Sequence, residues 1–391
     1  MLNQGSRRHA PGRWLGLVTA FVVCLAVAAC GGSTPSGGSS GSAGVSQANL
    51  TAVKAEIDKY TGLPAFVAPG PAIDKSKVAG KTVFYIPDSS ANPFAANIGN
   101  AMGDAAKLLG MNFVNCTTQG QVAQWVQCYG EALGRHANLI YDFGGVDPRV
   151  VGPQIAQAQQ AGVPVLAIHV YAASQPPVAV TSSVPAPYDD AARLMGDWVV
   201  YDTKGSAHVL VITSNEVIGT PPLVNGINGV FSRYCASSCR TTQVNVPVAD
   251  WSTKIQTEVQ SALNRDPDIN YIIPIYDSMS QFVVPAVTAS GKTGKVHIAT
   301  YNGTPFVLGY MQSGNLVSME VGENLDWLGW SYVDAAARVL SGGDVPKTLD
   351  EHTALRIFTK QNVADAGNPP KVSTGYGNAY VSGYKGLWGL S

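Results

Sequence analysis

Three patterns in the sequence consist of residue types that can do chemistry. Residues 37–41 read GGSSG and fit the G-x-S-x-G pattern of serine nucleophiles, but that pattern needs a strand-to-helix turn, which this Gly/Ser-rich tract cannot form. Residues 291–293 read GKT, like the end of a phosphate-binding loop, yet Ala286 stands where the leading glycine belongs. The six histidines lie far apart, with no H-E-x-x-H motif. We therefore expect no catalytic residue, no metal site and no cofactor.

The beginning of the chain has the pattern of an export signal. Three arginines precede an uncharged apolar run over residues 14–29, whose length and flanks fit a secretory signal better than a membrane-spanning helix. Residues 27–30 read VAAC, which resembles the lipobox of bacterial lipoproteins. The resemblance implies a signal peptide over 1–29 and lipidation of Cys30. The alternative is an ordinary signal peptide whose cleavage site happens to precede a cysteine.

Residues 31–46 are rich in Gly and Ser, so they predict a flexible coil with a typical span of about 20–24 Å.

The charge of the remaining chain is close to balanced. Without the signal's three arginines, 22 Lys and Arg remain against 26 Asp and Glu, and they form no basic cluster. We therefore expect no nucleic-acid partner. No second apolar stretch is long enough to span a bilayer, so we expect contact with the membrane through the lipid anchor only.

Four cysteines follow Cys30 in two local pairs, Cys116 with Cys128 and Cys235 with Cys239. An even number in an exported chain favours disulfides, although four cysteines allow three pairings. Metal binding is the rival, but the spacings are unlike those of zinc sites and no histidine lies beside them. We expect the local pairs to be bonded and to act as structural staples.

Short apolar runs alternate with helical patterns in two successive blocks. The first block predicts strands over 83–86, 111–114, 139–141 and 165–168, with helices over 93–109, 123–133 and 150–161. The second predicts strands over 209–212, 243–246, 271–273 and 296–299, with helices over 222–234, 251–264 and 280–289. Such alternation favours right-handed βαβ units. The predicted fold class is α/β, with two doubly wound parallel-sheet lobes joined by a hinge.

One family resemblance becomes specific on this framework. Residues 83–110, VFYIPDSSANPFAANIGNAMGDAAKLLG, resemble the opening βα unit of the ribose-type (type I) periplasmic sugar-binding proteins: a strand, a polar loop ending in Asn-Pro-Phe, and a helix. The AGVPV segment over 161–165 and the NGTP loop over 302–305 are similar to the same family, and the resemblance extends over 81–358. Sugar-responsive repressors share this core, but they carry a DNA-binding helix-turn-helix where this chain has an export signal.

The resemblance implies a monomer that captures one small-molecule ligand between its lobes and delivers it to the permease subunits of an ABC importer. A ligand-presenting subunit of a sensor is the alternative. The protein would be exported and lipid-anchored on the outer face of the cytoplasmic membrane or in the periplasm.

The resemblance also implies a set of ligand-binding residues. In the first lobe they are Asp88, Asn92, Phe94, Asp142 and His169, and in the second lobe Asn225, Trp251, Tyr276, Asp277, Tyr301, Asn302 and Glu323. Sugar binders of this family usually have an Asp-Arg pair where this chain has His169 and Val170, and often an arginine at the position of Asn225. We expect Phe94 and Trp251 to hold opposite faces of the ligand.

The expected site contains no Arg or Lys, so a carboxylate or phosphate ligand would find no bidentate partner. Aromatic faces with Asp, Asn, Glu and His suit a neutral sugar or polyol. Acidic groups beside aromatic rings would equally suit an amine. An aromatic nutrient is the third possibility.

The predicted organisation of the chain has five parts. They are a signal peptide over 1–29, a tether over 30–46, an N-terminal extension over 47–80 that packs outside the lobes, lobe 1 over 81–185 plus 324–352, and lobe 2 over 186–323 plus 353–391. Residues 181–187 contain two prolines and no helical pattern, which suits a crossing between lobes. We expect the other crossings near 323–324 and 353–354.

Overall fold

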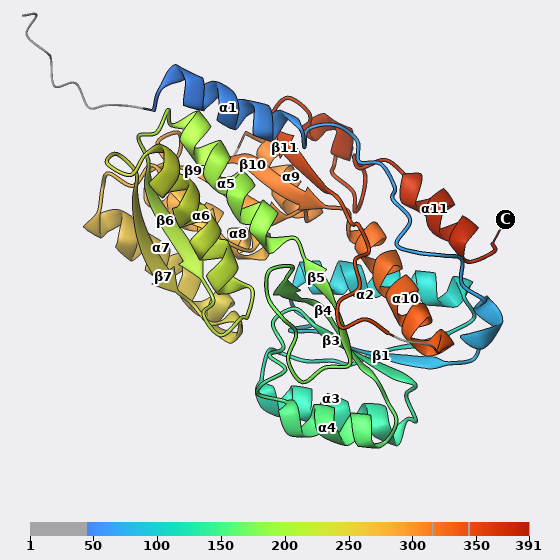
Figure 1. Ribbon diagram of the computed structural model, residues 1–391. Helices are drawn as coiled ribbons and strands as arrows, with labels where there is room; N and C mark the ends of the chain where they lie inside the picture. Colours follow the sequence, from blue (N-terminus) through green and yellow to red (C-terminus); the bar gives the residue numbers. More distant parts are fainter. Residues whose placement is uncertain (1–44, 315, 343–344, 391) are drawn as a thin grey trace, which may run out of the picture. The chain divides into compact units, whose positions relative to one another are not determined.

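The computed structural model describes residues 45–314, 316–342 and 345–390 (Figure 1). The predicted signal peptide, Cys30 and nearly all of the tether lie outside the described residues. The helices are α1 (Gln47–Asp58), α2 (Pro93–Leu108), α3 (Val122–Gly134), α4 (Gly152–Gln160), α5 (Tyr188–Asp202), α6 (Thr220–Tyr234), α7 (Trp251–Arg265), α8 (Ser280–Ala289), α9 (Pro305–Gln312), α10 (Leu325–Ser341) and α11 (Ala379–Leu387), with short 3-10 turns η1 (Lys75–Lys77), η2 (Val248–Asp250), η3 (Asp277–Met279) and η4 (Val363–Ala366). None of these described helices is long and apolar enough to cross a membrane.

The strands form two separate sheets. They are β1 (Thr82–Ile86), β2 (Asn112–Asn115), β3 (Leu139–Phe143), β4 (Val165–Ala172), β5 (Ser182–Ala186), β6 (His208–Thr213), β7 (Arg240–Asn245), β8 (Tyr271–Pro274), β9 (His297–Asn302), β10 (Val317–Glu323) and β11 (Leu355–Thr359). The sheet of lobe 1 has the order β2-β1-β3-β4-β5 and is parallel throughout. The sheet of lobe 2 has the order β11-β10-β9-β8-β6-β7, and β11 is its antiparallel edge strand. The predicted two-lobed α/β fold is confirmed.

Side-chain alternation along the strands of lobe 1 explains its layers. Val83 and Tyr85 of β1 pack with α2 and α10, whereas Phe84 and Ile86 pack with α3 and α4 on the other face (Figure 1). Both faces of a parallel sheet are covered in this way, so its strands read as nearly continuous apolar runs. In lobe 2, α5 packs on α6 and α7 on α8 around one apolar core.

The chain passes between the lobes after β5, after β10 and before β11. It leaves β5 at Ala186 and enters α5 at Tyr188, and it returns between Glu323 at the end of β10 and Leu325 at the start of α10. It reaches lobe 2 again at β11, after residues 345–349 have paired beside β5.

The segment 181–187 is more than a crossing, because Ser182–Ala186 forms the edge strand β5. Its sequence, SSVPA, lacks the apolar run of the other strands. Pro185 is tolerated there because an edge strand does not need every backbone N–H for its sheet.

The C-terminal segment corrects the predicted boundary of lobe 2. Helix α11 and the residue after it place Tyr380, Tyr384 and Trp388 in the apolar core of lobe 1, where Trp330 stacks on Trp388 with ring centroids 5.1 Å apart. This aromatic packing assigns residues 379–390 to lobe 1, although 353–391 were expected in lobe 2.

The N-terminal extension contacts both lobes. Helix α1 packs on α5 in lobe 2, and the carbonyl of Tyr60 accepts a hydrogen bond from Ile357 N of β11 at 2.7 Å. Farther along, the Phe66 ring lies 5.0 Å from the Tyr384 ring in lobe 1. We call residues 59–73 the N-terminal strap, because this segment joins the two lobes beside α11 (Figure 1).

Both predicted disulfides are present, Cys116–Cys128 and Cys235–Cys239. The second closes a short loop between α6 and β7.

Candidate functional site

A cavity lies where the carboxyl ends of the two sheets face each other. Its volume is about 30 Å³, room for one or two water molecules. Its lining comes from both lobes: Asp88, Asn92, Phe94, Phe143, Gly144, Gly145 and His169 from lobe 1, and Tyr188, Val217, Val248, Trp251, Tyr276, Ser278 and Asn302 from lobe 2. The lobes are therefore drawn together around a space too small for a sugar ring.

The loop after β1 supplies a buried carboxyl group. Asn92 caps α2 by accepting a hydrogen bond from Phe94 N, and its Nδ2 donates to Asp88 Oδ2 at 2.9 Å. Across the cleft, Ser278 Oγ donates to Asn92 Oδ1 at 2.9 Å. Asp88 Oδ1 has no hydrogen-bond partner within the described chain. Burial raises the pKa of Asp88 to about 6, although the bond from Asn92 acts in the opposite direction.

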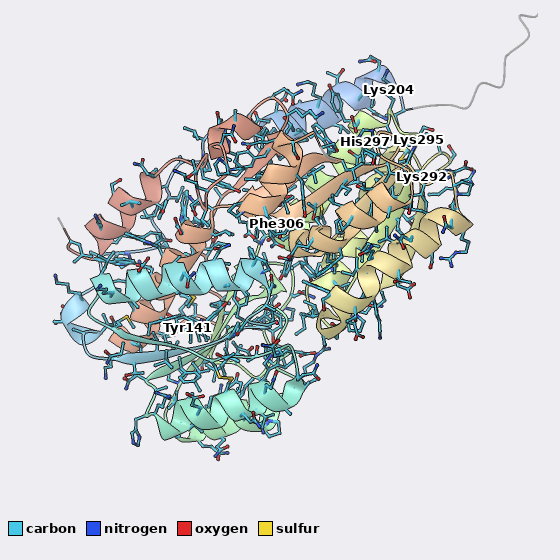
Figure 2. The ribbon with its side chains drawn as sticks, turned by 180° about the vertical axis from the view of Figure 1, so that it is seen from behind. Tyr141, Lys204, Lys292, Lys295, His297 and Phe306 are labelled. Atoms are coloured by element: carbon cyan, nitrogen blue, oxygen red, sulfur yellow. A yellow bond between two sulfur atoms is a disulfide. The ribbon has the colours of Figure 1, made fainter. Side chains whose placement is uncertain are left out.

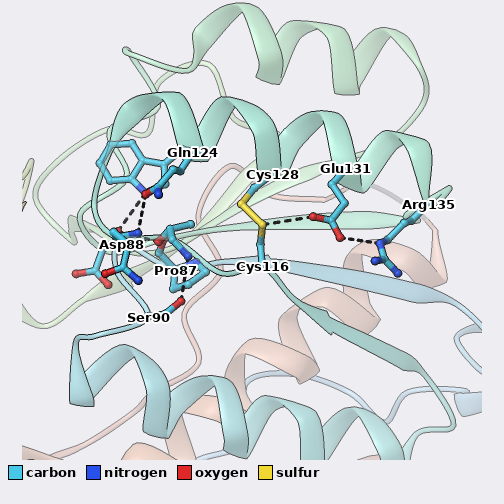
Figure 3. Close-up of a disulfide and its surroundings, with 11 residues drawn as sticks. Pro87, Asp88, Ser90, Cys116, Gln124, Cys128, Glu131 and Arg135 are labelled. Atoms are coloured by element: carbon cyan, nitrogen blue, oxygen red, sulfur yellow. Dashed lines mark hydrogen bonds and ion pairs between the residues drawn. A yellow bond between two sulfur atoms is a disulfide. The ribbon is translucent and has the colours of Figure 1, made fainter.

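The first disulfide lies to the side of this loop (Figure 3). Two side chains donate to the backbone carbonyl of Asp88, Trp125 Nε1 at 3.1 Å and Thr118 Oγ1 at 3.2 Å. Cys116 lies two residues before Thr118, and Cys128 lies one helical turn after Trp125. The disulfide thus links the two segments that hold the Asp88 loop.

His169 connects the lobes at the inner end of the cavity. Its Nε2 lies 2.9 Å from Glu323 Oε2 and 3.2 Å from the hydroxyl of Tyr301, while the hydroxyl of Tyr188 donates to the His169 carbonyl at 2.7 Å. The three partners all belong to lobe 2. His169 has a left-handed backbone with φ of 59°, at an irregularity in the β4–β5 pairing. Strained backbone conformations of this kind are common at functional sites, where the surrounding contacts hold them in place.

Aromatic rings form the apolar walls. In lobe 1, Phe94 lies 5.0 Å from the His169 ring and 6.0 Å from Phe143. In lobe 2, Trp251 lies 6.3 Å from Tyr276, and its Nε1 donates to Ser214 Oγ at 2.9 Å, which fixes the indole against its own lobe.

Asn302, the last residue of β9, has a side-chain amide donor without a hydrogen-bond partner within the described chain. It is 2 % exposed, its Nδ2 has no partner within the described chain, and its φ is 145°. The cavity therefore has a buried amide donor on one lobe and a buried carboxylate acceptor, Asp88, on the other.

Most of the residues implied by the resemblance lie at the cavity or directly behind it. Those that line it are Asp88, Asn92, Phe94, His169, Trp251, Tyr276 and Asn302. Three others lie behind this layer: Tyr301 and Glu323 bond to His169, and Asp277 bonds to Thr304.

Two expected positions do not reach the cavity. Asp142 accepts a hydrogen bond from the Tyr129 hydroxyl of α3 at 3.0 Å, because strand alternation turns it away while its neighbour Phe143 faces the cavity. Burial raises the pKa of Asp142 to about 8. Asn225 is exposed on α6, because Leu223 and Ile227 occupy the buried face of that helix.

Sequence reasoning missed half of the lining. The missed residues are Phe143, Gly144, Gly145, Tyr188, Val217, Val248 and Ser278. Two positional signals could have found some of them: Phe143 is the last residue of β3 and is followed by Gly144 and Gly145, and Tyr188 is the first residue of the helix after a crossing.

In the described ranges, one group of side chains has metal-like spacing. It consists of His208, Asp266 and Asp268, none of which lines the cavity.

Several solved structures have a similar fold. An ABC transporter solute binding protein from Agrobacterium vitis, solved with bound allitol, is 18 % identical; its TM-score is 0.65, over 74 % of this chain and 99 % of that chain. A 5-methylthioribose transporter solute binding protein from Thermotoga lettingae is 16 % identical; its TM-score is 0.68, over 80 % of this chain and 99 % of that chain. A glucose-galactose binding protein from Geobacillus stearothermophilus is 19 % identical; its TM-score is 0.63, over 72 % of this chain and 98 % of that chain.

At these identities the solved structures show a shared fold. The comparison with curated proteins found no match. The periplasmic binding protein domain matches residues 83–344, more than half of the chain, and this span contains every residue of the cavity lining. The chain therefore belongs to the periplasmic binding protein family, whose members bind transported solutes outside the cytoplasm.

Proposed function

We propose that this protein captures a small neutral sugar or polyol between its lobes and delivers it to the permease subunits of an ABC importer, without catalysing a reaction. The observation that carries the proposal is the pair of unmet polar groups in the cavity, Asp88 Oδ1 and Asn302 Nδ2. A hydroxyl group both donates and accepts, so a polyol can satisfy a buried acceptor and a buried donor with one kind of substituent.

The rest of the lining supports a neutral ligand. It contains no Lys or Arg, and Lys204, Lys292 and Lys295 lie at the end of lobe 2 remote from lobe 1 (Figure 2). An anionic ligand would thus lack a charged partner. Phe94 and Trp251, from opposite lobes, offer apolar faces for the C–H surface of a ring.

The small volume of the cavity implies movement. A sugar ring needs more than about 30 Å³, so the lobes must separate to admit it and then close on it. The bonds of His169 to Glu323 and Tyr301 connect the lobes and would break or rearrange in this motion.

Lipidation of Cys30 would keep the protein at the outer face of the cytoplasmic membrane, beside its importer. This part of the proposal is supported by the lipobox-like VAAC and the Gly/Ser-rich tether. Substituting Cys30→Ala should release the protein from the membrane fraction or block its processing, and an unchanged distribution would exclude the anchor.

A ligand panel tests the capture of sugars. Melting temperature and calorimetric titration are measured with allitol, D-tagatose, L-arabinose, D-galactose and 5-methylthioribose, and in parallel with choline, putrescine and benzoate. We expect a rise in melting temperature with at least one hydroxylated compound, because binding stabilises the folded state by mass action.

The variant Asn302→Ala should weaken the binding of that compound by about 10-fold, the effect of losing one buried hydrogen bond. Asn225→Ala, on the exposed face of α6, is the matched control and should leave the affinity unchanged. Binding of an amine or an aromatic acid, with no response to any sugar or polyol, would overturn the assignment of ligand class.

A further inference from the structure

Two fully buried carboxyl groups lie immediately behind the cavity. Asp277 follows β8 and Glu320 lies on β10, and both are 0 % exposed. They hold consecutive residues of the loop after β9. Glu320 Oε1 accepts a hydrogen bond from Gly303 N at 2.6 Å, and Asp277 Oδ2 accepts from Thr304 N at 2.6 Å and from its Oγ1 at 2.5 Å.

The loop that they hold carries Asn302, whose amide lines the cavity. Its backbone is unusual, because φ is 145° at Asn302 and 93° at Gly303. A Cβ at Gly303 would lie 2.9 Å from the backbone N of Glu323, so this position requires glycine. A backbone of this kind persists only when its surroundings fix it, and the two carboxyl groups supply that fixation.

No hydrogen bond from a Lys or Arg side chain to Asp277 or Glu320 is present among the described residues, so their negative charges are not both balanced. The Tyr376 hydroxyl lies near both carboxyl groups, and Arg356, a cation that also lies near Tyr376, donates to Asp365 and to the carbonyls of Thr61 and Gly375. Two carboxylates in contact without a cation repel each other.

The positions of the oxygens suggest where a proton resides. Burial and the neighbouring Asp277 raise the pKa of Glu320 well above its ordinary value, and burial raises the pKa of Asp277 to about 6. Glu320 Oε2 has no hydrogen-bond partner within the described chain. If Glu320 holds the proton and donates it to Asp277, then Asp277 remains the carboxylate that accepts from Thr304.

We propose that Asp277 and Glu320 share one proton and act as a positioning pair, which fixes the Asn302–Thr304 loop in the conformation that presents the Asn302 amide to the ligand. Only the last clause rests on the proposed function. The pair itself follows from the contacts with Gly303 and Thr304.

Amide hydrogen exchange at Gly303 and Thr304 tests the positioning role without any ligand. The isosteric Glu320→Gln keeps an acceptor for Gly303 and a donor for Asp277, so protection should stay within a factor of about two. Glu320→Ala should speed exchange at Gly303 by about 10-fold relative to Ile212 in β6, the effect of one lost hydrogen bond. Equal protection of Gly303 in the alanine variant would overturn the proposal.

The shared proton has its own readout, the change in melting temperature from pH 6 to pH 9. A carboxyl group whose pKa is raised by folding holds its proton in the folded state after the unfolded chain has lost it, so stability falls as the pH rises through the folded pKa. The wild type should lose stability over this range, and Glu320→Gln should lose clearly less. Glu258→Gln, at an exposed position of α7, should behave like the wild type.

An identical pH dependence in the wild type and Glu320→Gln would overturn the shared proton. Neither readout uses a sugar. If both behave as expected while every sugar and polyol fails to bind, the positioning pair stands and the proposed function falls.

Discussion

The Asp88 side chain lines the cavity, where a carboxylate could bind a ligand, but it is also buried, and burial makes the charged form less stable. Burial disfavours its charged form and raises its pKa to about 6, while Asn92 and the backbone partly oppose this effect. A carboxylate that remains charged at neutral pH in such a place is kept for its ligand rather than for the stability of the fold.

Substituting Asp88→Asn should therefore stabilise the free protein at pH 7. Asn keeps an acceptor for Asn92 and removes the buried charge. The folded-state pKa is raised, so the contribution of the wild-type group is complete below about pH 4 and is lost as the pH rises through about 6. We expect a gain of roughly 1–3 kcal/mol at pH 7 that disappears near pH 4.

Urea unfolding at both pH values checks this prediction. Asp104→Asn on the exposed face of α2 is the control and should change little at either pH. A stability difference for Asp88→Asn that is the same at pH 4 and pH 7 would show that burial does not perturb this carboxyl group.

At the scale of elements, the two disulfides have different relations to the site. Cys116–Cys128 (Figure 3) joins the segments whose Thr118 and Trp125 hold the Asp88 carbonyl. Cys235–Cys239 closes a loop that contributes no residue to the cavity lining. We therefore expect Cys235–Cys239 to stabilise the fold alone, and Cys116–Cys128 to stabilise both the fold and the site.

Removing each bridge by paired alanine substitutions should separate these roles. Loop-closure entropy predicts a loss of about 3 kcal/mol for the pair 12 residues apart and about 2 kcal/mol for the pair 4 residues apart. Loss of the first bridge should also weaken binding of the best sugar or polyol of the panel by several-fold, and loss of the second should not. Equal affinities in both variants, measured by calorimetry below their melting temperatures, would deny the first bridge a role in the site.

The elements that could be predicted from sequence are those with strong local signals. Apolar runs such as that of β3 predicted the strands, and the helical pattern over 93–109 predicted α2. Ser182–Ala186 has no apolar run, and its strand character comes from pairing with β4, which only the fold supplies. Likewise, the core contacts of α11 involve residues far apart in the sequence.

The candidate site was predictable to the same extent. The family pattern places residues at strand ends, but it does not settle which face they take. Asp142 and Phe143 are neighbours, and strand alternation sends one toward Tyr129 and the other to the cavity. The partners of His169 come from three separate elements of lobe 2, so no local pattern could indicate them.

At the scale of the whole molecule, the N-terminal strap adds a connection to the crossings at β5, β10 and β11. It lies outside the matched span 83–344. Its lobe 2 end pairs with β11 through Tyr60, and its lobe 1 end is held by Phe66 between Trp327 and Tyr384. We expect a strap that is fixed on both lobes to resist their separation and so to favour the closed arrangement.

Substituting Phe66→Ala should release the lobe 1 end of the strap and shift the ligand-free protein toward the open state. Because a ligand that needs closure then binds to a rarer state, its apparent affinity should fall by about 2- to 10-fold. Small-angle scattering should give a larger radius of gyration than the wild type without ligand, and an equal one with a saturating concentration of the best sugar or polyol of the panel. Val67→Ala, the neighbouring exposed position, is the matched control and should change neither quantity. A lowered melting temperature for Phe66→Ala with unchanged scattering and affinity would mean that Phe66 only packs, and that the strap does not influence the movement of the lobes.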